Sequence, residues 1–337
     1  MSVDAGRPVP TVDVVVTGAG GFIGGHLVAD LVASGATVRA VDIKPLDQWY
    51  QHTAGADDLV RDLSLAEGAR DAVAGAHTIY NLASDMGGMG FIANNKAACM
   101  LSVLINTHML TASLAAGVQR FFFASSACVY TAGKQDSPEV TPLVEADAYP
   151  AMPEDGYGWE KLFSERMCHH FTEDFGLPTR VARYHNVYGP LGAWAGGREK
   201  APAAVCRKVA EAVLTGRHEI EIWGDGSQTR SFTYIDDCLH GSRLITEGRW
   251  SDPVNVGSDE LVTINELVSI VEGIAGIELE RSYRLDAPVG VRGRNSDNTL
   301  IKERFGWAPS TPLLAGLEKN YAWVYDQVAS QAAAVGR

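Results

Sequence analysis

Tyr157 and Lys161, in the segment YGWEK, are four residues apart, a spacing that places two side chains on one face of a helix. A lysine cation beside a phenol favours the phenolate and lowers the pKa of the tyrosine toward the working pH. Ser125 and Ser126 end an apolar segment upstream, where a serine hydroxyl can share a proton network with Tyr157 and a substrate. These residues predict a site for proton transfer, although a Tyr-x3-Lys pair by itself is also typical of a surface contact.

A glycine-rich turn, TGAGGFIG, precedes these residues and is typical of a dinucleotide site. Gly18, Gly21 and Gly24 follow a GxxGxxG spacing, which differs from the plain GxGxxG fingerprint but has the same physical basis. A tight turn lets backbone N–H groups and a helix N-terminus approach a pyrophosphate. The turn lies between an apolar run at 12–17, typical of a buried strand, and a helical pattern that ends at Gly35, so we predict a dinucleotide-binding opening.

Asp42 favours NAD over NADP as this dinucleotide. It ends the predicted strand 37–42, 18 residues after Gly24, where a carboxylate accepts hydrogen bonds from a ribose diol and repels a 2′-phosphate. Lys44 close by keeps NADP as an alternative, and an aspartate in this place is also typical of an ordinary turn. The predicted cofactor-binding residues are Gly18, Gly21, Phe22, Ile23, Gly24, Asp42, Asp62, Leu63, Leu82, Tyr157 and Lys161.

The residues between these motifs alternate between strand and helix patterns. Sequential βα units predict a right-handed, mostly parallel sheet, and after about Pro190 the alternation loosens. We therefore predict an α/β fold: a Rossmann-type doubly wound parallel sheet, mainly in residues 1–190, and a smaller C-terminal α/β substrate lobe in 191–337, with some chain crossing back. The expected strands are 12–17, 37–42, 59–63, 77–83, 120–126 and 179–189, and the expected helices between them lie near 66–74, 96–116 and 157–175.

Composition limits the partners and the location of the protein. The formal net charge of −13 disfavours nucleic acid and acidic membranes as partners. Five scattered cysteines without a CxxC pair or a His/Cys cluster predict neither disulfides nor a metal site. The segment MSVDAGRPVPTVD lacks an apolar signal core, and no apolar run is expected to reach membrane-spanning length, so we expect a cytoplasmic protein.

Several motifs together resemble the extended short-chain dehydrogenase/reductases over about residues 12–325: TGAGGFIG, SSACVY, YGWEK, RYHNVYGP and GDGSQTRSFTYIDD. Longer strings, NLASDMGGMGF, FFFASSACVY, GGREKAPAA and VRGRNSDN, are similar to the GDP-mannose 3,5-epimerase family. From the residues alone, Cys128 is more typical of a small buried hydrophobe and Lys200 of a solvated loop. The resemblance implies instead that they form an acid/base pair. The catalytic residues that it implies are Cys128, Lys200, Ser126, Tyr157 and Lys161.

The reaction that the resemblance implies fits these residue types. If Tyr157 removes the proton of the C4 hydroxyl while hydride passes to NAD, C4 becomes a ketone and the protons on C3 and C5 become acidic. A base on one face of the sugar and an acid on the other, Cys128 and Lys200, then invert these centres, and return of the hydride regenerates bound NAD. The implied isomerase converts GDP-mannose to GDP-L-galactose (C3 and C5) or to GDP-L-gulose (C5 alone), and the sequence does not decide between the products.

The diphosphate of a GDP-sugar calls for arginine forks. Candidates are Arg230 in QTRSF and Arg292 and Arg294 in VRGRNSDN, with Arg207 and Lys208 as weaker ones. The glycine-flanked loop GAWAGGREKAP suits a mobile segment that closes over the substrate. The predicted substrate-binding residues are Gly87, Gly88, Met89, Ser125, Ser126, Asn186, Lys200, Arg230, Arg292 and Arg294.

Other activities fit the same core. A nucleotide-sugar 4-epimerase has no evident need for Cys128 and Lys200, and a 4,6-dehydratase commonly has a glutamate that SSACVY lacks. A GDP-heptose is an alternative substrate, and a non-enzymatic NAD-sensing protein is the alternative of a different class. Extended family members commonly form homodimers through two helices per subunit, here the segments 97–116 and 157–175.

Overall fold

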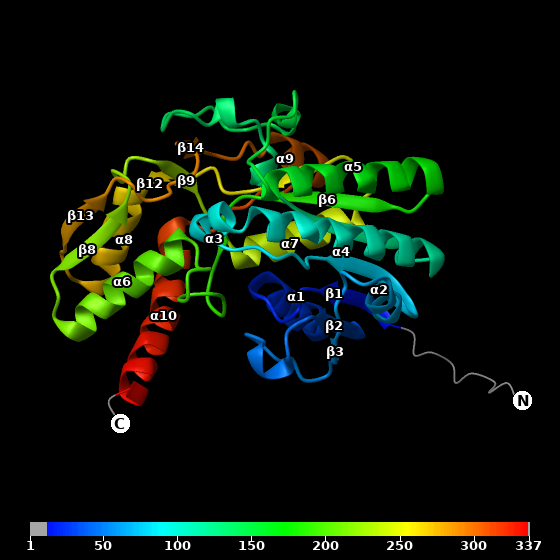
Figure 1. Cartoon of the computed structure of the whole chain (residues 1–337), viewed down its shortest axis with the longest axis horizontal. Coiled ribbons are helices and arrows are strands. Elements are labelled where there is room, and N and C mark those ends of the chain that lie inside the picture. Colours follow the sequence, from blue (N-terminus) through cyan, green and yellow to red (C-terminus); the bar gives the residue numbers. More distant parts are fainter. Residues whose placement is uncertain (1–11, 336–337) are drawn as a thin grey trace, which may run out of the picture. The chain divides into compact units, whose positions relative to one another are not determined.

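The computed structural model describes residues 12–335 and contains a seven-stranded sheet (Figure 1). The strand order is β11-β6-β5-β4-β1-β2-β3, and every recorded pairing of neighbours in this sheet is parallel. The order reverses between β1 and β4, which is the topological switch of a doubly wound fold. The predicted fold class is confirmed. The strands of this sheet are β1 (Val12–Thr17), β2 (Val38–Asp42), β3 (Asp57–Val60), β4 (Ala76–Asn81), β5 (Arg120–Ser126), β6 (Thr179–Tyr184) and β11 (Val254–Val256).

Four helices of the first part begin and end close to the predicted positions: α1 (Phe22–Ala33), α2 (Ala66–Val73), α4 (Lys96–Ala115) and α5 (Tyr157–Phe175). The short helix α3 (Met89–Asn94) was not predicted. The later helices are α6 (Ala201–Thr215), α7 (Ile235–Glu247), α8 (Ile264–Ala275), α9 (Thr299–Phe305) and α10 (Leu313–Val335). The short strands are β7 (Val187–Tyr188), β8 (Glu219–Trp223), β9 (Thr229–Ser231), β10 (Thr233–Tyr234), β12 (Leu261–Thr263), β13 (Glu280–Arg284) and β14 (Gly293–Arg294).

Three of the predicted strands have different bounds. The expected strand 77–83 is β4, which ends at Asn81. The expected strand 179–189 is two strands, β6 and β7, because Asn186 between them has a φ of 44° and cannot continue an extended backbone. The expected strand 59–63 lies earlier, as β3, and Asp62 follows it in a turn in which its side chain accepts hydrogen bonds from Ser64. Polar side chains that bond the nearby backbone in this way end strands locally.

The chain divides into two compact units that interleave along the sequence. Among the described residues, unit 1 contains 12–84, Leu101–Ala124 and Phe163–Val181, and unit 2 contains Asp85–Met100, Ser125–Leu162 and 182–335. The predicted division at residue 190 separates a part that binds the dinucleotide from a part that binds the substrate, and it stays a prediction. The predicted absence of a signal core concerns mainly residues 1–11, which lie outside the described residues.

The core of unit 1 consists of aliphatic and aromatic side chains from the sheet and from the helices that cover it. Val15, Ile79 and Phe121 are fully buried on the strands, and Met109 and Leu110 of α4 are fully buried in the same cluster. In residues 12–335, α4 is long and apolar enough to span a membrane by length and composition, so the expectation that no segment reaches that length is wrong. The buried side of α4 in this core explains its apolar composition.

In unit 2, α6, α8 and α10 pack against one another beside the parallel pair β8 and β13 (Figure 1). α6 begins directly after Lys200, has a proline in its first turn, and ends at Gly216 with a φ of 69°. A proline at the start and a left-handed glycine at the end are strong helix boundaries. These signals fix Lys200 at the N-terminus of α6.

Candidate active site

The glycine turn of unit 1 is a backbone cradle that side chains would fill. Gly18 has a φ of 70°, and a Cβ there would lie 3.0 Å from the backbone nitrogen of Ala83. A Cβ on Gly24 would overlap the carbonyl oxygen of Gly18, and one on Gly21 would lie 3.1 Å from that oxygen. Gly21 is the N-cap of α1, so the first N–H groups of the helix point out of the turn. The residues therefore fit a pyrophosphate held by backbone N–H groups.

Asp42 lies at the end of β2 and is held against this turn. Its Oδ2 accepts a hydrogen bond from the Gly20 N–H at 3.0 Å, and its Oδ1 accepts one from the Lys44 N–H at 3.0 Å. Trp49 packs closely on Gly20, so that a Cβ added to Gly20 would lie only 2.7 Å from the Trp49 ring. Lys44 is turned to the Gly20 carbonyl, 3.4 Å from Nζ, and to the Tyr50 ring. A carboxylate fixed beside the turn suits a ribose diol, so the fit favours NAD.

The other predicted cofactor residues of unit 1 surround the same strands. Leu63 is 3% exposed and belongs to the core, and the Leu82 N–H donates to Thr17 Oγ1 at 3.1 Å. Phe22 and Ile23 form the first turn of α1. Their roles, and that of Asp62, stay predictions.

A pocket in unit 2 is lined by four of the five predicted catalytic residues: Ser126, Cys128, Tyr157 and Lys200. Residues from β5, the segment before α5, the start of α6 and β14 line it. Ser125 is buried but is not among the lining residues. Lys161 is likewise not a lining residue, although it lies one turn beyond Tyr157 on α5. The predicted residues that the pocket brings together are Gly87, Gly88, Met89, Ser126, Cys128, Tyr157, Asn186, Lys200, Arg230 and Arg294.

Cys128 lies just after β5, where the chain turns through a short 3-10 helix. Ser126 Oγ accepts a hydrogen bond from the Cys128 N–H at 3.2 Å, and the Cys128 carbonyl accepts one from the Glu154 N–H at 3.0 Å. The Arg294 guanidinium lies 3.6 Å from Cys128 Sγ. Burial and, next, the Glu154 carboxylate raise the pKa of the thiol to about 11, against the effect of Arg294. Cys128 is thus a protonated thiol at neutral pH.

Tyr157 begins α5 and is 5% exposed. Burial raises its pKa well above the ordinary value, and Cys128 and Glu160 add to the shift, whereas a hydrogen bond with Ser126 opposes it. Lys161 Nζ lies 5.5 Å from the Tyr157 ring centroid and only 3.6 Å from Glu160 Oε2. The expected lowering of the tyrosine pKa is wrong for the protein groups alone, because burial raises the pKa and Glu160 lies beside the Lys161 ammonium and offsets its charge. The hydrogen bond between Ser126 and Tyr157 is present, and the proton network that they were predicted to share with a substrate stays a prediction.

The Lys200 side chain reaches the same pocket from the N-terminus of α6. Burial lowers the pKa of this ammonium group, and Cys128 and Cys238 oppose the shift. A lysine with a lowered pKa has a larger share of neutral amine, which can act as a base. The pocket therefore holds a thiol whose raised pKa keeps its proton on sulfur and an amine whose lowered pKa lets it lose its proton more readily.

Comparison with known proteins agrees with this geometry. The model of the NAD dependent epimerase/dehydratase family matches residues 14–257. The chain belongs to this family. It is 45% identical over 322 residues to GDP-mannose 3,5-epimerase 1 of Oryza sativa subsp. japonica, covering 95% of this chain and 84% of that protein. It is 43% identical to GDP-mannose 3,5-epimerase of Arabidopsis thaliana, with 97% and 85% covered.

Solved structures of other epimerase/dehydratase family members share the fold. MoeE5 in complex with UDP-glucose and NAD is 30% identical, with a TM-score of 0.77 and coverage of 94% of this chain and 99% of that chain. The UDP-glucose 4-epimerase of Thermotoga maritima has a TM-score of 0.84 at 24% identity, with the same coverage, and supports the fold alone. The predicted family and the predicted NAD dependence are confirmed.

The segment that carries Lys200 in this family member is anchored to the segment before α3. Arg198 forms a 2.8 Å ion pair with Asp85, stacks on the Phe91 ring at 3.8 Å, and accepts a hydrogen bond at its carbonyl from the Gly88 N–H. A Cβ on Gly88 would overlap the Glu199 carbonyl. These contacts fix the backbone next to Lys200. That the segment closes over a substrate stays a prediction.

We expect Arg198→Ala to slow the catalysed reaction about 10- to 100-fold, because a base displaced by about 1 Å loses its alignment with the substrate. Steady-state turnover at saturating nucleotide sugar measures the effect. Arg284→Ala is the matched control, since Arg284 forms an exposed 3.6 Å ion pair with Asp286 outside the pocket. Equal rates for wild type and both variants would show that Arg198 does not position Lys200.

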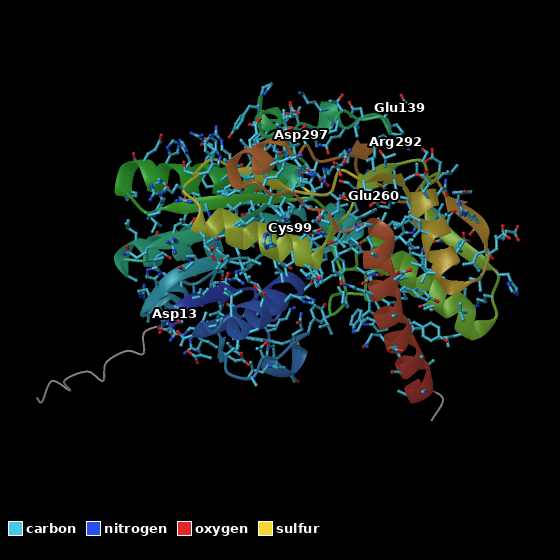
Figure 2. All side chains as sticks on the ribbon, turned by 180° about the vertical axis from the view of Figure 1, so that it is seen from behind. Asp13, Cys99, Glu139, Glu260, Arg292 and Asp297 are labelled. Carbon is cyan, nitrogen blue, oxygen red and sulfur yellow. The ribbon has the colours of Figure 1, made fainter. Side chains whose placement is uncertain are left out.

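Arg230 and Arg294 line the pocket of this epimerase/dehydratase, as do the weaker candidates Arg207 and Lys208, whereas Arg292 does not. Arg230 Nη2 donates to the carbonyls of Val289 and Val291, and burial lowers its pKa to about 9. Arg292, labelled in Figure 2, lies 3.4 Å from Asp225 and donates to Ser227 Oγ at 2.8 Å. Arg230 and Arg294 thus place two guanidinium groups at the pocket, where a diphosphate could be bound. Arg292 does not line the pocket, so the structure gives no support for its predicted role in substrate binding.

Glu154, which lines the pocket next to Cys128, was not predicted from the sequence. The only local signal in the sequence is its position three residues before Tyr157. A cluster on α5 was not predicted either: the donor atoms of His169, His170 and Glu173 lie within 4.8 Å of one another. Glu173 accepts from both imidazoles, at 3.0 and 2.8 Å, and these hydrogen bonds account for the cluster without an ion.

Proposed function

We propose that the chain is an isomerase that inverts C3, C5 or both in GDP-mannose, through a transient 4-keto sugar, and forms GDP-L-galactose, GDP-L-gulose or both. The observation that carries the proposal is the pocket of unit 2, which holds Cys128 and Lys200 together with Tyr157. The similarity to proteins named GDP-mannose 3,5-epimerase supports the choice of sugar. A 4-epimerase uses the tyrosine and has no step for a thiol–amine pair.

The first step requires removal of the C4 hydroxyl proton. Tyr157 and Ser126 share a hydrogen bond in the pocket. Because burial keeps the phenol protonated in the protein alone, Tyr157 must first release its own proton to water, and the phenolate then takes the C4 hydroxyl proton while the serine orients the hydroxyl. Gly18, Gly21 and Gly24 would hold NAD at its pyrophosphate, and Asp42 would hold it at its ribose. NAD, when bound, accepts the C4 hydride and later returns it.

The second step requires proton transfer at carbon. With C4 oxidised, C3 and C5 are α to a carbonyl, and their protons can leave as an enolate forms. The Lys200 amine and the Cys128 thiol supply a base and an acid within one pocket. When the two groups act on opposite faces of the ring, the centre between them inverts.

The diphosphate of the substrate is assigned to Arg230 and Arg294, both of which line the pocket. Each guanidinium uses part of its N–H groups on the protein, Arg230 on backbone carbonyls and Arg294 on side chains around Cys128. The remaining N–H groups can donate to phosphate oxygens. Asn186 also lines the pocket, with its Nδ2 donating to the Ser231 carbonyl at 3.0 Å, which leaves its side-chain oxygen for a substrate hydroxyl.

The test is proton exchange at carbon. Purified protein is incubated with GDP-mannose in D2O, and NMR follows label at C3 and C5 and the configuration of the product. Label and inversion at C3 and C5 would support the full proposal, and label at C5 alone would indicate a gulose-forming enzyme. No label in the presence of bound NAD would overturn the substrate, and a product without its 6-hydroxyl would indicate a dehydratase. A Cys128→Ala variant, which should form no inverted product, is run beside the wild type.

We further propose a homodimer. In unit 1, α4 and α5 expose large apolar side chains, with Leu101 62%, Leu104 40% and Phe163 54% exposed. Such side chains at helical spacing are typical of a face that a second copy covers. The mass of the protein in solution, measured by light scattering, tests the proposal.

A further inference from the structure

Three segments that are distant in sequence place a carboxylate and a guanidinium at the Cys128 thiol. Arg294 Nη1 lies 3.6 Å from Cys128 Sγ, and Arg294 Nη2 lies 3.4 Å from Glu154 Oε2. Arg294 Nε donates to Gln135 Oε1 at 2.6 Å, and Gln135 is 1% exposed. The arginine is therefore fixed from two sides, and it holds the Glu154 carboxylate next to the thiol.

The second oxygen of this carboxylate is available to the thiol. Glu154 Oε1 is buried, and among the described residues no N–H or O–H group donates to it. The Cys128 thiol lies within hydrogen-bonding reach of this carboxylate. The Glu154 backbone is tied to Cys128 by the hydrogen bond from its N–H to the Cys128 carbonyl. Arg294 already occupies Oε2, so a thiol proton is the donor that the free oxygen lacks. Leaving a buried carboxylate oxygen without a donor is costly, which favours an S–H that points to it.

We propose that Glu154 is a positioning residue that accepts a hydrogen bond from the Cys128 thiol and keeps the proton on sulfur, so that Cys128 begins the reaction as the proton donor. The inference rests on the proposed function. Lys200 is then the base: its amine takes the C–H proton, an enolate forms, and the Cys128 thiol delivers its proton to the other face. Lys200 ammonium and Cys128 thiolate remain, and loss of a proton from nitrogen and uptake of one by sulfur, both through water, restore the starting state.

The charged groups around the thiol determine whether loss of the Glu154 charge raises or lowers the pKa of Cys128. Glu154 raises the pKa of Cys128, while Arg294 lowers it, and the net result with burial is about 11. Lys200, Tyr157 and Arg230 also act electrostatically on this thiol from the start of α6, from α5 and from β9. Glu154 is the one carboxylate among these groups. Neutralising it should therefore lower the pKa of the thiol.

The first test needs no substrate. The rate at which a small alkylating reagent modifies Cys128 is measured between about pH 7 and 10, because only the thiolate reacts. We expect Glu154→Gln to move the profile down by about one pH unit, which is roughly a tenfold faster reaction at a fixed pH. Cys128→Ala gives the background from Cys99, Cys168, Cys206 and Cys238, which are all buried.

Two further variants separate charge from geometry. Glu154→Asp keeps the charge and should stay within about threefold of wild type, whereas Gln135→Leu releases Arg294 and should slow alkylation. An unchanged or slower reaction in Glu154→Gln would overturn the proposal. So would equal shifts in Glu154→Gln and Glu154→Asp, since the effect would then come from geometry.

The second readout is the pH dependence of inversion of GDP-mannose. If Cys128 begins as the donor, the rate of inversion falls as pH rises through the pKa of the thiol, and Glu154→Gln should move this fall to lower pH. Faster inversion at neutral pH in Glu154→Gln would mean that Cys128 begins as the base, against the proposal. If no nucleotide sugar exchanges at all, the proposed function fails, while alkylation still decides whether Glu154 controls the thiol.

Discussion

Lys200→Ala should abolish deuterium entry into GDP-mannose, whereas Cys128→Ala should abolish inversion but still let deuterium enter with retained configuration. The asymmetry follows because a base alone can remove a proton and return a deuteron to the same face, while inversion needs the acid on the other face. Loss of a positioned acid or base typically costs 10²–10⁴-fold, so we expect inversion to fall by about that factor in both variants. NMR of the recovered nucleotide sugar measures label and configuration separately.

The control for these variants is Lys302→Ala. Lys302 is an exposed lysine in the last turn of α9 and does not line the pocket. It should keep both exchange and inversion at saturating substrate. Exchange that survives in Lys200→Ala but not in Cys128→Ala would reverse the roles of the two residues. Full activity in either variant would remove that residue from the reaction.

The dinucleotide half of the fold was predictable because its signals are local. The GxxGxxG turn, the apolar strand before it and Asp42 after the next strand lie within residues 12–42, and their spacing depends only on the period of a strand and a helix. The pairing of β1 with β2 brings the turn and Asp42 together, as a βαβ unit requires. Where a side chain interrupts the period, as at Asn186 with its positive φ, the predicted bounds fail.

The acid/base pocket was predictable only in part, because its contacts are distant in sequence. Cys128 and Arg294 are separated by 166 positions, and no residue near either one indicates the contact. Side chains two residues apart on a strand point to the same face, which would place Arg292 and Arg294 together. β14 contains only Gly293 and Arg294, so Arg292 lies outside the strand and the two-residue period does not apply to it. Glu154 has no motif at all. The resemblance named Cys128 and Lys200, whereas the groups that set their protonation required coordinates.

Gly24→Ala should destabilise unit 1 and abolish binding of NAD. The added Cβ would overlap the Gly18 carbonyl oxygen and lie 2.7 Å from its carbonyl carbon and 2.9 Å from Ala19 Cα. These neighbours are backbone atoms of the turn, so no side-chain rotation relieves the clash, and overpacking of this kind costs about 1–3 kcal/mol or more. The turn that would approach the pyrophosphate must open to admit the methyl group. Thermal unfolding with and without added NAD, and the NAD content of the purified variant, measure the two effects.

Gly273→Ala is the matched control, because a Cβ on this exposed glycine of α8 meets nothing within 4 Å. Alanine favours the helix interior over glycine by up to about 1 kcal/mol, so this variant should unfold at the same or a higher temperature and bind NAD as the wild type does. The two substitutions are chemically identical and differ only in the space around the new methyl group. Equal NAD binding by both would mean that the close approach of α1 to the Gly18 carbonyl is not what shapes the cofactor turn.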